Sequence, residues 1–500
     1  MPQPDVTVIV LAAGAGTRMR SATPKVMHPI AGRPLVWHAL AAAAGITPTH
    51  LVAVLGHGRE QVTGFLATAT DLPPVISGVQ EQQLGTGHAA ACGLDALRAR
   101  IGTVSGTVIV TSGDTPLLRA ETLELLARTH ADAGNAVTVL TATVADPTGY
   151  GRIVREADGT VSRIVEHRDA DDEQRAIREI NSSVYAFDAA VLVDTLPRVG
   201  TSNSQGEQYL TDVLALARAD GHRVGAVIAD DAMETEGVND RAQLAALARV
   251  LNDRIVRRHQ LAGVTILDPV STWIDADVTI GADSVLEPGV QLKAGTSIGR
   301  DCRIGPDTTL SGCTLGDDVA ITRSHCIDAR VGDGADVGPF AYLRPQTVLH
   351  HGAHVGAHVE IKKSTIGPGA KVPHLTYLGD AEVGAGSNIG AGVITANYDG
   401  VHKFPTVIGE HVFVGTNSTL VAPVTLADGS YVAAGSTVTQ DVAAGDLAVA
   451  RGRQHHSRGW VLRRRADSRY ADAARRAGAG NGAEQPAGQP DGADDKDSPA

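Results

Sequence analysis

The sequence predicts two large domains of different construction: an α/β domain with a mostly parallel sheet, then a solenoid of short strands. The chain has 500 residues, which exceeds the usual size of a single domain. Its first half alternates apolar, strand-like runs with Ala- and Leu-rich stretches, the pattern of a sheet covered by helices. Its second half repeats an aliphatic residue every six positions, a period that fits neither a helix nor an amphipathic strand.

The first domain is predicted to span residues 1–240. Short, wholly apolar runs are typical of strands buried on both faces of a parallel sheet. We expect such strands at 6–11, 51–55, 107–111 and 136–144, and helices at 35–44, 88–98 and 120–131. Ligands of these sheets bind beyond the carboxyl ends of the strands, where the loop 14–25 and the motif Ser112-Gly113-Asp114 are found.

A linker helix is expected at residues 241–262, with residue 240 as an alternative first residue. The solenoid is expected at 263–460. Its repeats run from about 264 to about 445. Three hexads would close one triangular coil, and stacked coils would bury the repeated residues along one axis. The three clearest runs are Ile280, Leu286, Leu292, Ile298, Ile304 and Leu310; Val331, Val337, Leu343, Leu349, Val355 and Ile361; and Ile408, Val414, Leu420, Leu426, Val432 and Val438.

The last segment, residues 461–500, is predicted to be a tail that is disordered from about 477, because no Leu, Ile, Val or Phe follows that point. A net charge of −13 argues against general nucleic-acid binding. The N-terminus lacks a signal-peptide pattern, and no apolar run is long enough for a membrane span, so we expect a cytoplasmic protein without a membrane partner. The four cysteines, Cys92, Cys302, Cys313 and Cys326, are expected to be reduced and at least half-buried, with a metal site as the alternative.

A phosphate-binding loop is predicted directly after the first strand. The string Leu11-Ala-Ala-Gly-Ala-Gly-Thr-Arg-Met19 is followed five residues later by Pro24-Lys25. Its glycines allow backbone N–H groups to approach phosphate oxygens, and Arg18 and Lys25 add fixed positive charges. A lone Gly-x-Gly often marks only a tight turn, but the complete string favours phosphate binding.

This string resembles the signature of sugar-1-phosphate nucleotidyltransferases. Further motifs follow in an unbroken order: Gln80, Gln83-Leu-Gly-Thr-Gly-His88, Ser112-Gly-Asp114, Gly149-Tyr-Gly-Arg152, Ile164-Val-Glu166-His167, Glu179-Ile-Asn181 and Glu236-Gly-Val-Asn239. Together with the hexapeptide repeats, they resemble the bacterial bifunctional enzymes that are both UDP-N-acetylglucosamine pyrophosphorylase and glucosamine-1-phosphate N-acetyltransferase. The resemblance covers roughly residues 6–460. It implies a Rossmann-like nucleotidyltransferase domain and a left-handed parallel β-helix.

For the first domain, the resemblance implies that UTP and N-acetylglucosamine 1-phosphate are joined with release of pyrophosphate. Arg18 and Lys25 would hold the phosphates, and Asp114 and Asn239 would ligate Mg²⁺. The residues implied to bind UTP or UDP-N-acetylglucosamine are Leu11, Ala12, Ala13, Gly14, Lys25, Gln80, Gly85, Thr86, Ser112, Gly113, Asp114, Gly151, Glu166, Asn181 and Asn239.

The residues themselves leave three simpler interpretations open. Asp114 could cap the following helix, Glu166 could be an ordinary surface carboxylate, and Asn239 could be the N-cap of the linker helix. The chemistry favours the functional interpretation, because a sugar phosphate that attacks an α-phosphate brings two anions together and needs positive charge nearby.

A second site is expected where the six-residue repeat is interrupted. Residues 395–404 form a polar stretch that leaves the coil, and His374 and Tyr377 stand at outward positions nearby. Acetyl transfer to a sugar amine needs the neutral amine, so a histidine base is suitable. A lone histidine is more often structural, but the surrounding pattern favours His374 as the proton acceptor. The histidines at 350, 351, 354 and 358 are expected to be surface residues rather than zinc ligands.

The resemblance also implies the partners of His374. Glucosamine 1-phosphate would be bound by Arg344, Lys362, Tyr377 and Asn388. Acetyl-CoA would be bound by Ala391, Asn397, Tyr398, Lys403, Thr416, Ala434 and Arg451. In this family each acetyl-CoA site is completed by neighbouring chains of a homotrimer. Pro373 and Thr416 replace a more usual glycine and serine, which leaves the backbone at Pro373 less certain.

The resulting hypothesis is a bifunctional enzyme that acetylates glucosamine 1-phosphate in the solenoid and then transfers a uridylyl group in the first domain. In this family the product feeds peptidoglycan, lipopolysaccharide and other cell-envelope polysaccharides. One alternative keeps the nucleotidyltransferase and makes the solenoid only an oligomerisation module. Another makes both domains a non-catalytic binding subunit. Trp460 and the run Arg463-Arg464-Arg465 could cover the coenzyme or be merely solvated.

Overall fold

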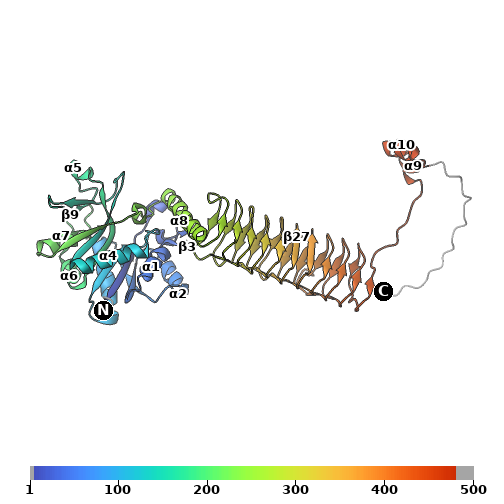
Figure 1. Cartoon of the computed structure of the whole chain (residues 1–500), viewed down its shortest axis with the longest axis horizontal. Helices are drawn as coiled ribbons and strands as arrows, with labels where there is room; N and C mark the ends of the chain where they lie inside the picture. The colour runs from blue at the N-terminus through green and yellow to red at the C-terminus, as the bar shows by residue number, and fades with distance from the viewer. Residues whose placement is uncertain (1–4, 480–500) are drawn as a thin grey trace, which may run out of the picture.

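The computed structural model describes residues 5–479 and joins an α/β domain to a long three-sided solenoid (Figure 1). The predicted fold class is confirmed in both halves. The expected disordered tail, from about 477, lies almost wholly outside the described residues.

The first domain is built on a sheet in which β1 (Val6–Ala12) is a central strand. Its strand order is β11-β7-β10-β6-β1-β4-β5. The other strands are β4 (His50–Leu55), β5 (Val75–Val79), β6 (Thr107–Ser112), β7 (Val137–Thr143), β10 (Glu179–Asp188) and β11 (Val224–Ile228). Only β10 runs antiparallel to its neighbours on this path. The hairpin β8 (Arg152–Arg155) and β9 (Val161–Val165) extends from β10. The four predicted strands are therefore confirmed to within a residue or so.

Helices cover both faces of this sheet, and each layer has its own apolar core. One core joins the sheet to α1 (Leu35–Gly45), α2 (Arg59–Thr68) and α4 (Ala120–Ala133). The other joins it to α3 (Thr86–Ile101), α6 (Ala189–Thr195) and α7 (Asp212–Ala219). A single turn, α5 (Asp172–Arg175), lies beyond β9. Apolar residues on both faces of the strands explain why these strands read as continuous hydrophobic runs.

The solenoid runs from β12 (Thr265–Ile266) to β41 (Leu447–Ala448). Its strands form three parallel sheets of eleven, ten and nine strands. Within each sheet, neighbours are three strands apart in the sequence, except for the last pair, β39 (Tyr431–Val432) and β41. The repeated aliphatic residues pack into one continuous core; Leu310, Ile361 and Leu420 are completely buried. The six-residue repeat therefore encodes one strand and one corner per hexad.

Helix α8 (Arg241–Leu261) joins the two domains and contributes to both cores. Leu247 packs with Met19 and Val238 of the first domain, whereas Ile255 and Val256 belong to the solenoid core. The predicted linker helix is confirmed. A hairpin, β2 (Pro29–Ile30) and β3 (Arg33–Pro34), also reaches the first coils, where Arg33 pairs with Asp277.

Two short helices, α9 (Trp460–Arg464) and α10 (Arg469–Arg476), follow an exposed segment beyond the last coil (Figure 1). Cys302, Cys313 and Cys326 are buried and Cys92 is half-buried, all without disulfides, as expected. Within residues 5–479, no helix is both long and apolar enough to cross a membrane.

Candidate active sites

The first candidate site is a cavity of about 390 Å³ at the carboxyl ends of β1 and β6. The predicted residues that line it are Leu11, Ala12, Ala13, Gly14, Lys25, Gln80, Gly85, Thr86, Ser112, Asp114, Glu166 and Asn181. Four other predicted residues lie outside this lining: Arg18, Gly113, Gly151 and Asn239. Residues far apart in the sequence thus converge on one pocket, at the edge where parallel sheets bind ligands.

The loop after β1 is shaped around Lys25. Gly16 has a left-handed backbone (φ 59°), and a Cβ there would lie 2.4 Å from the Cβ of Lys25. The Lys25 ammonium forms an ion pair with the Asp114 carboxylate. Gly113 donates its backbone N–H to the Leu11 carbonyl at 2.8 Å, which ties the two strand ends together. Asp114 therefore does not cap the next helix, whose N-cap position is held by Arg119.

A backbone hydrogen bond holds the segment of Asn239 close to Asp114. The backbone N–H of Val238 donates to the Asp114 carbonyl at 2.9 Å. The Asn239 side-chain oxygen accepts a hydrogen bond of 2.7 Å from Arg18. Asp240, not Asn239, caps α8, since its carboxylate accepts from the first turn of the helix. The interpretation of Asn239 as a helix cap is therefore wrong.

These two side chains suit a hard cation. Asp114 and Asn239 each present a side-chain oxygen, the type of ligand that Mg²⁺ prefers. The Asp114 oxygen pairs with Lys25, and the Asn239 oxygen accepts a hydrogen bond from Arg18. Positive charge is thus matched to both oxygens.

The far end of the cavity is formed by β10 and the β8–β9 hairpin. Asn181 is buried, and its side-chain oxygen accepts from the Tyr185 hydroxyl at 2.9 Å. A Cβ on Gly151 would lie 3.4 Å from both the Asn181 Cβ and a Glu166 oxygen, so glycine leaves this end open. Burial raises the pKa of Glu166, and the charges of Asp169 and Asp212 raise it further. Glu166 is therefore not an ordinary surface carboxylate.

The opposite end is closed by the loop that precedes α3. The Gln80 amide donates to the Gly85 carbonyl at 3.0 Å, and the Gln83 amide donates to the Ala13 carbonyl at 2.7 Å. Gly85 has φ 106° and lies so close to Gln208 that a Cβ would be 2.4 Å from the Gln208 carbonyl oxygen. The loop is therefore fixed from both sides.

Sequence reasoning missed one wall of this cavity. Its lining also includes Ser183, Tyr185, Gln205, Glu207, Tyr209, Leu210 and Thr211. The segment 205–211 is a polar stretch with one aromatic residue directly before α7, and this composition was the available signal. Thr86 accepts a hydrogen bond of 3.0 Å from the backbone of Leu210, which places this wall against the predicted residues.

The second candidate site lies on the solenoid, where His374 is exposed at the end of β30 (Lys371–His374). Strand pairing aligns Lys371 with Asn388 of β33 (Asn388–Ile389), then Phe413 and Tyr431 in the next coils. Three positions further along each coil are His374, Ala391, Thr416 and Ala434, which we call the corner row. Arg451 extends the row by donating to the Ala434 carbonyl at 2.8 Å. Pro373 continues the strand, which resolves the backbone at that position.

A loop between β34 (Ile394–Ala396) and β35 (Thr406–Ile408) leaves the coil beside this row. Asn397 at its base is buried and donates to Asp380 at 2.7 Å. Tyr398 and Lys403 pair across the loop, and Tyr398 is 59% exposed. A Cβ on Gly379 would lie 2.4 Å from the Tyr377 hydroxyl and 2.6 Å from the Asn397 amide nitrogen. Glycine is therefore required where these two side chains meet.

The predicted sugar-phosphate residues divide between two faces. Arg344, Lys362 and Tyr377 belong to the ten-stranded sheet, in which Arg344 pairs with Glu360 at 2.8 Å. The close contact with Lys403, together with the positive charge of that residue, lowers the pKa of Lys362. Asn388 belongs instead to the sheet of His374. One chain thus presents two basic groups on one face and the histidine at the edge of another.

Two further predictions concern histidines and the C-terminal helices. Among the residues that the structure describes, no group of three or more possible metal ligands was found, and His354 pairs with Asp336 at 2.6 Å. Trp460 is 46% exposed, with the Arg465 guanidinium 5.5 Å from its ring centre.

Comparison with known proteins is consistent with this division of the chain. A MobA-like NTP transferase domain matches residues 8–182, and the bacterial transferase hexapeptide (six repeats) matches residues 277–312 and 405–440. The chain is 55% identical to Bifunctional protein GlmU of Streptomyces avermitilis, over 93% of this chain and 96% of that protein. It is 54% identical to the Streptomyces coelicolor protein of the same name, over 93% and 96%. For a Mycobacterium sp. protein of that name, the identity is 53%, over 97% of each chain.

Relatives of this identity span almost the whole chain, and the two family matches fall in the α/β domain and in the solenoid. The resemblance noted from the sequence is confirmed. The chain belongs to the bifunctional GlmU family, and it has a uridylyltransferase activity and an acetyltransferase activity.

Proposed function

We propose that the cavity beside Lys25 and Asp114 transfers the uridylyl group of UTP to N-acetylglucosamine 1-phosphate, and that the corner row around His374 acetylates glucosamine 1-phosphate beforehand. The pairing of Lys25 with Asp114 at the cavity floor carries the first assignment. It places a fixed cation and an oxygen ligand where two phosphate groups would meet.

In the first site, backbone N–H groups of residues 13–16 and the side chains of Arg18 and Lys25 would hold the triphosphate. Asp114 and Asn239 would hold Mg²⁺, which when bound supplies positive charge to the phosphate oxygens. The sugar phosphate is already ionised, so no residue has to remove a proton. The chain would therefore act by positioning the two substrates and neutralising their charge.

The two ends of the cavity would set specificity. The uracil and ribose would lie at the end formed by residues 11–14, Gln80, Gly85 and Thr86. The acetylated sugar would lie at the end formed by Gly151, Glu166 and Asn181, where the carboxylate and amide oxygens can accept hydrogen bonds from sugar hydroxyls. Ser112 and Gly113 would complete the floor between them.

In the second site, His374 would accept the proton that the sugar amine loses when it attacks the acetyl thioester. The corner row continues from His374 through Ala391, Thr416 and Ala434 to Arg451, and offers a path along the solenoid for an extended coenzyme. Asn397, Tyr398 and Lys403 would hold its other side. Arg344, Lys362, Tyr377 and Asn388 would hold glucosamine 1-phosphate.

A homotrimer would unite these groups, because His374 and Asn388 lie in one sheet whereas Arg344, Lys362 and Tyr377 lie in another. We take residues 1–240 as the uridylyltransferase domain, 241–262 as the linker, 263–460 as the acetyltransferase domain and 461–500 as a tail. Cytoplasmic location follows from the supply of UTP and acetyl-CoA as substrates. Nucleic acid and membranes have no part in this proposal.

A substitution at Asp114 tests the assignment of the first site. Asp114→Ala should abolish pyrophosphate release from UTP and N-acetylglucosamine 1-phosphate, while thiol release from acetyl-CoA with glucosamine 1-phosphate continues at the wild-type rate. Unchanged pyrophosphate release would contradict the metal assignment. If His374→Ala left thiol release intact, the solenoid site would be wrongly placed.

A further inference from the structure

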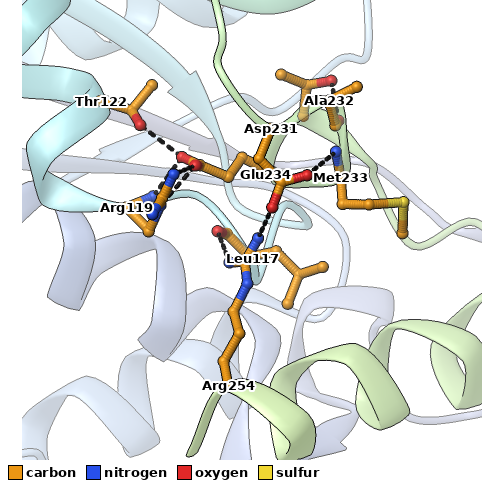
Figure 2. A network of polar contacts seen from close by, with 9 residues as sticks. Leu117, Arg119, Thr122, Asp231, Ala232, Met233, Glu234 and Arg254 are labelled. Atoms are coloured by element: carbon orange, nitrogen blue, oxygen red, sulfur yellow. Dashed lines mark hydrogen bonds and ion pairs between the residues drawn. The ribbon is translucent and has the colours of Figure 1, made fainter. Parts of the chain in front are cut away.

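A polar network joins the two segments that carry the proposed metal ligands (Figure 2). The first segment runs from Asp114 to the start of α4, and the second from Asp231 to Asn239. The second segment contains Glu234, which is completely buried in a short 3-10 helix (Ala232–Thr235). Its carboxylate accepts a hydrogen bond of 2.6 Å from Thr122 and pairs with the Arg119 guanidinium. The segments are thus tied at the end remote from the cavity.

Arg254 of α8 connects the same two segments a second time, as Figure 2 shows. Its guanidinium donates to the Leu117 carbonyl at 2.7 Å and to the Asp231 carboxylate at 2.7 Å. Leu117 is three residues after Asp114 in the sequence. Asp231 also caps the 3-10 helix, since it accepts from the backbone of Met233 at 3.0 Å. A planar guanidinium can satisfy both acceptors at fixed angles.

Helix α8 is also anchored to the solenoid, through Asn252, which lies two residues before Arg254. The Asn252 amide donates to the Thr272 carbonyl at 2.8 Å, and its oxygen accepts from the backbone of Ile274 at 2.9 Å. Helix α8 therefore contacts the first coils through Asn252 and the nucleotide-binding domain through Arg254. The helix is also packed into the apolar cores of both domains, through Leu247 on one side and Ile255 and Val256 on the other.

We propose that Arg254 is a positioning residue for uridylyl transfer, holding the segments of Asp114 and Asn239 at the separation that Mg²⁺ and the phosphates require. The proposal rests on the assignment of Asp114 and Asn239 as metal ligands. Arg254 itself is not among the residues that line the cavity. Its loss would leave the Leu117 carbonyl and Asp231 without their shared donor and would allow the two segments to separate.

The variant Arg254→Met keeps the length of the side chain and removes both hydrogen bonds. We expect kcat for uridylyl transfer to fall roughly tenfold, because small displacements of catalytic groups cost about this much or more. We also expect a severalfold rise in the Mg²⁺ concentration that gives half the maximal rate. Acetyl transfer by the same protein should be unchanged, which reports that the chain is folded. Arg254→Lys, with a single ammonium, should give an intermediate Mg²⁺ requirement.

Arg249→Met is the matched control. Arg249 lies on the same helix, is exposed to a similar extent, and donates to the Val270 carbonyl at 2.8 Å on the solenoid side. Arg249→Met should leave the Mg²⁺ requirement of uridylyl transfer unchanged. Asp114→Asn, measured in parallel, tests the metal assignment separately from the role of Arg254. If this variant retained uridylyl transfer, the metal assignment would fail, independently of the result for Arg254→Met.

Two results would overturn the role of Arg254 itself. One is a wild-type kcat and Mg²⁺ requirement in Arg254→Met. The other is an equal loss of both activities, together with a lower melting temperature, because that would indicate only a loss of folded protein.

Discussion

Lys362, on the solenoid, and Lys403, on the loop that leaves it, lie side by side, and the close contact and positive charge of Lys403 lower the pKa of Lys362. Two ammonium groups held together favour an anion between them, and the phosphate of the acceptor sugar has the required charge. Asp380, which lies beside them, is already engaged by Asn397 and by Lys363 at 3.2 Å.

Replacement of this basic pair should weaken binding of glucosamine 1-phosphate. Lys362→Met is expected to raise the KM for that substrate by roughly tenfold or more, because a charge-assisted contact to phosphate is lost. Steady-state acetyl transfer measures this, and the KM should rise with salt in the wild type and less so in the variant. Lys293→Met, in the early coils, is the control. An unaltered KM in Lys362→Met would place the phosphate elsewhere.

His374→Gln should lower kcat for acetyl transfer by about 10²- to 10⁴-fold, the range expected for loss of a general base. The KM for acetyl-CoA should change little, since the rest of the corner row remains. His354→Gln, a histidine that pairs with Asp336 on the same sheet, provides the comparison and should keep full activity. Equal effects of the two substitutions would argue against a special role for His374.

Chelation of divalent cations should separate the two activities within one protein. With EDTA, uridylyl transfer should fall to background, because Asp114 and Asn239 then have no cation to place beside the phosphates. Acetyl transfer, measured in the same tube by thiol release, should persist. Added Mg²⁺ should restore pyrophosphate release. Loss of both activities on chelation would contradict a metal site confined to the first domain.

The titration of Glu166 should make the stability of the first domain depend on pH. Its folded-state pKa is raised by burial and by Asp169 and Asp212, so folding favours the protonated acid. This contribution to stability is complete below the ordinary pKa of glutamate and is lost as the pH rises through the raised value. Glu166→Gln should therefore raise the melting temperature of the first domain at neutral pH, with a difference that vanishes in acid.

The same variant should raise the KM for N-acetylglucosamine 1-phosphate roughly tenfold, since a charged acceptor of sugar hydroxyls is removed. Glu173→Gln, on the exposed turn α5, is the matched control for both measurements. A lower melting temperature in Glu166→Gln would show that the carboxylate is stabilising and that the direction of its pKa shift is wrong.

Local patterns predicted much of this protein. The repeated aliphatic residues predict a stacked coil, because burial of every sixth residue suits no other regular structure. Likewise, strand ends of a parallel sheet meet at one edge, so the loop at 14–25 and Asp114 could be placed together from the sequence. These predictions depended only on chain neighbours and on general sheet geometry.

Contacts made by distant segments were not predictable in this way. The wall containing Glu207 and Tyr209 is held against the loop before α3 by the packing of Gly85 on Gln208 and by the hydrogen bond from Leu210 to Thr86. Asp240 rather than Asn239 caps α8, while the Asn239 side chain accepts from Arg18, a residue distant in the sequence. The antiparallel direction of β10 follows from tertiary packing and leaves no periodic signal. The pairing of Lys362 with Lys403 likewise needs the loop to fold back on the coil.

The regular rise of the solenoid has a consequence for the fate of the intermediate. In the eleven-stranded sheet, six steps separate β12, next to α8, from β30, which carries His374. At about 4.8 Å per step, this amounts to about 29 Å along the axis. N-acetylglucosamine 1-phosphate formed beside His374 should therefore diffuse through water before capture by the cavity of the first domain. Radiolabelled glucosamine 1-phosphate, supplied with unlabelled N-acetylglucosamine 1-phosphate, should give a nucleotide sugar whose specific radioactivity is diluted in proportion to the added pool.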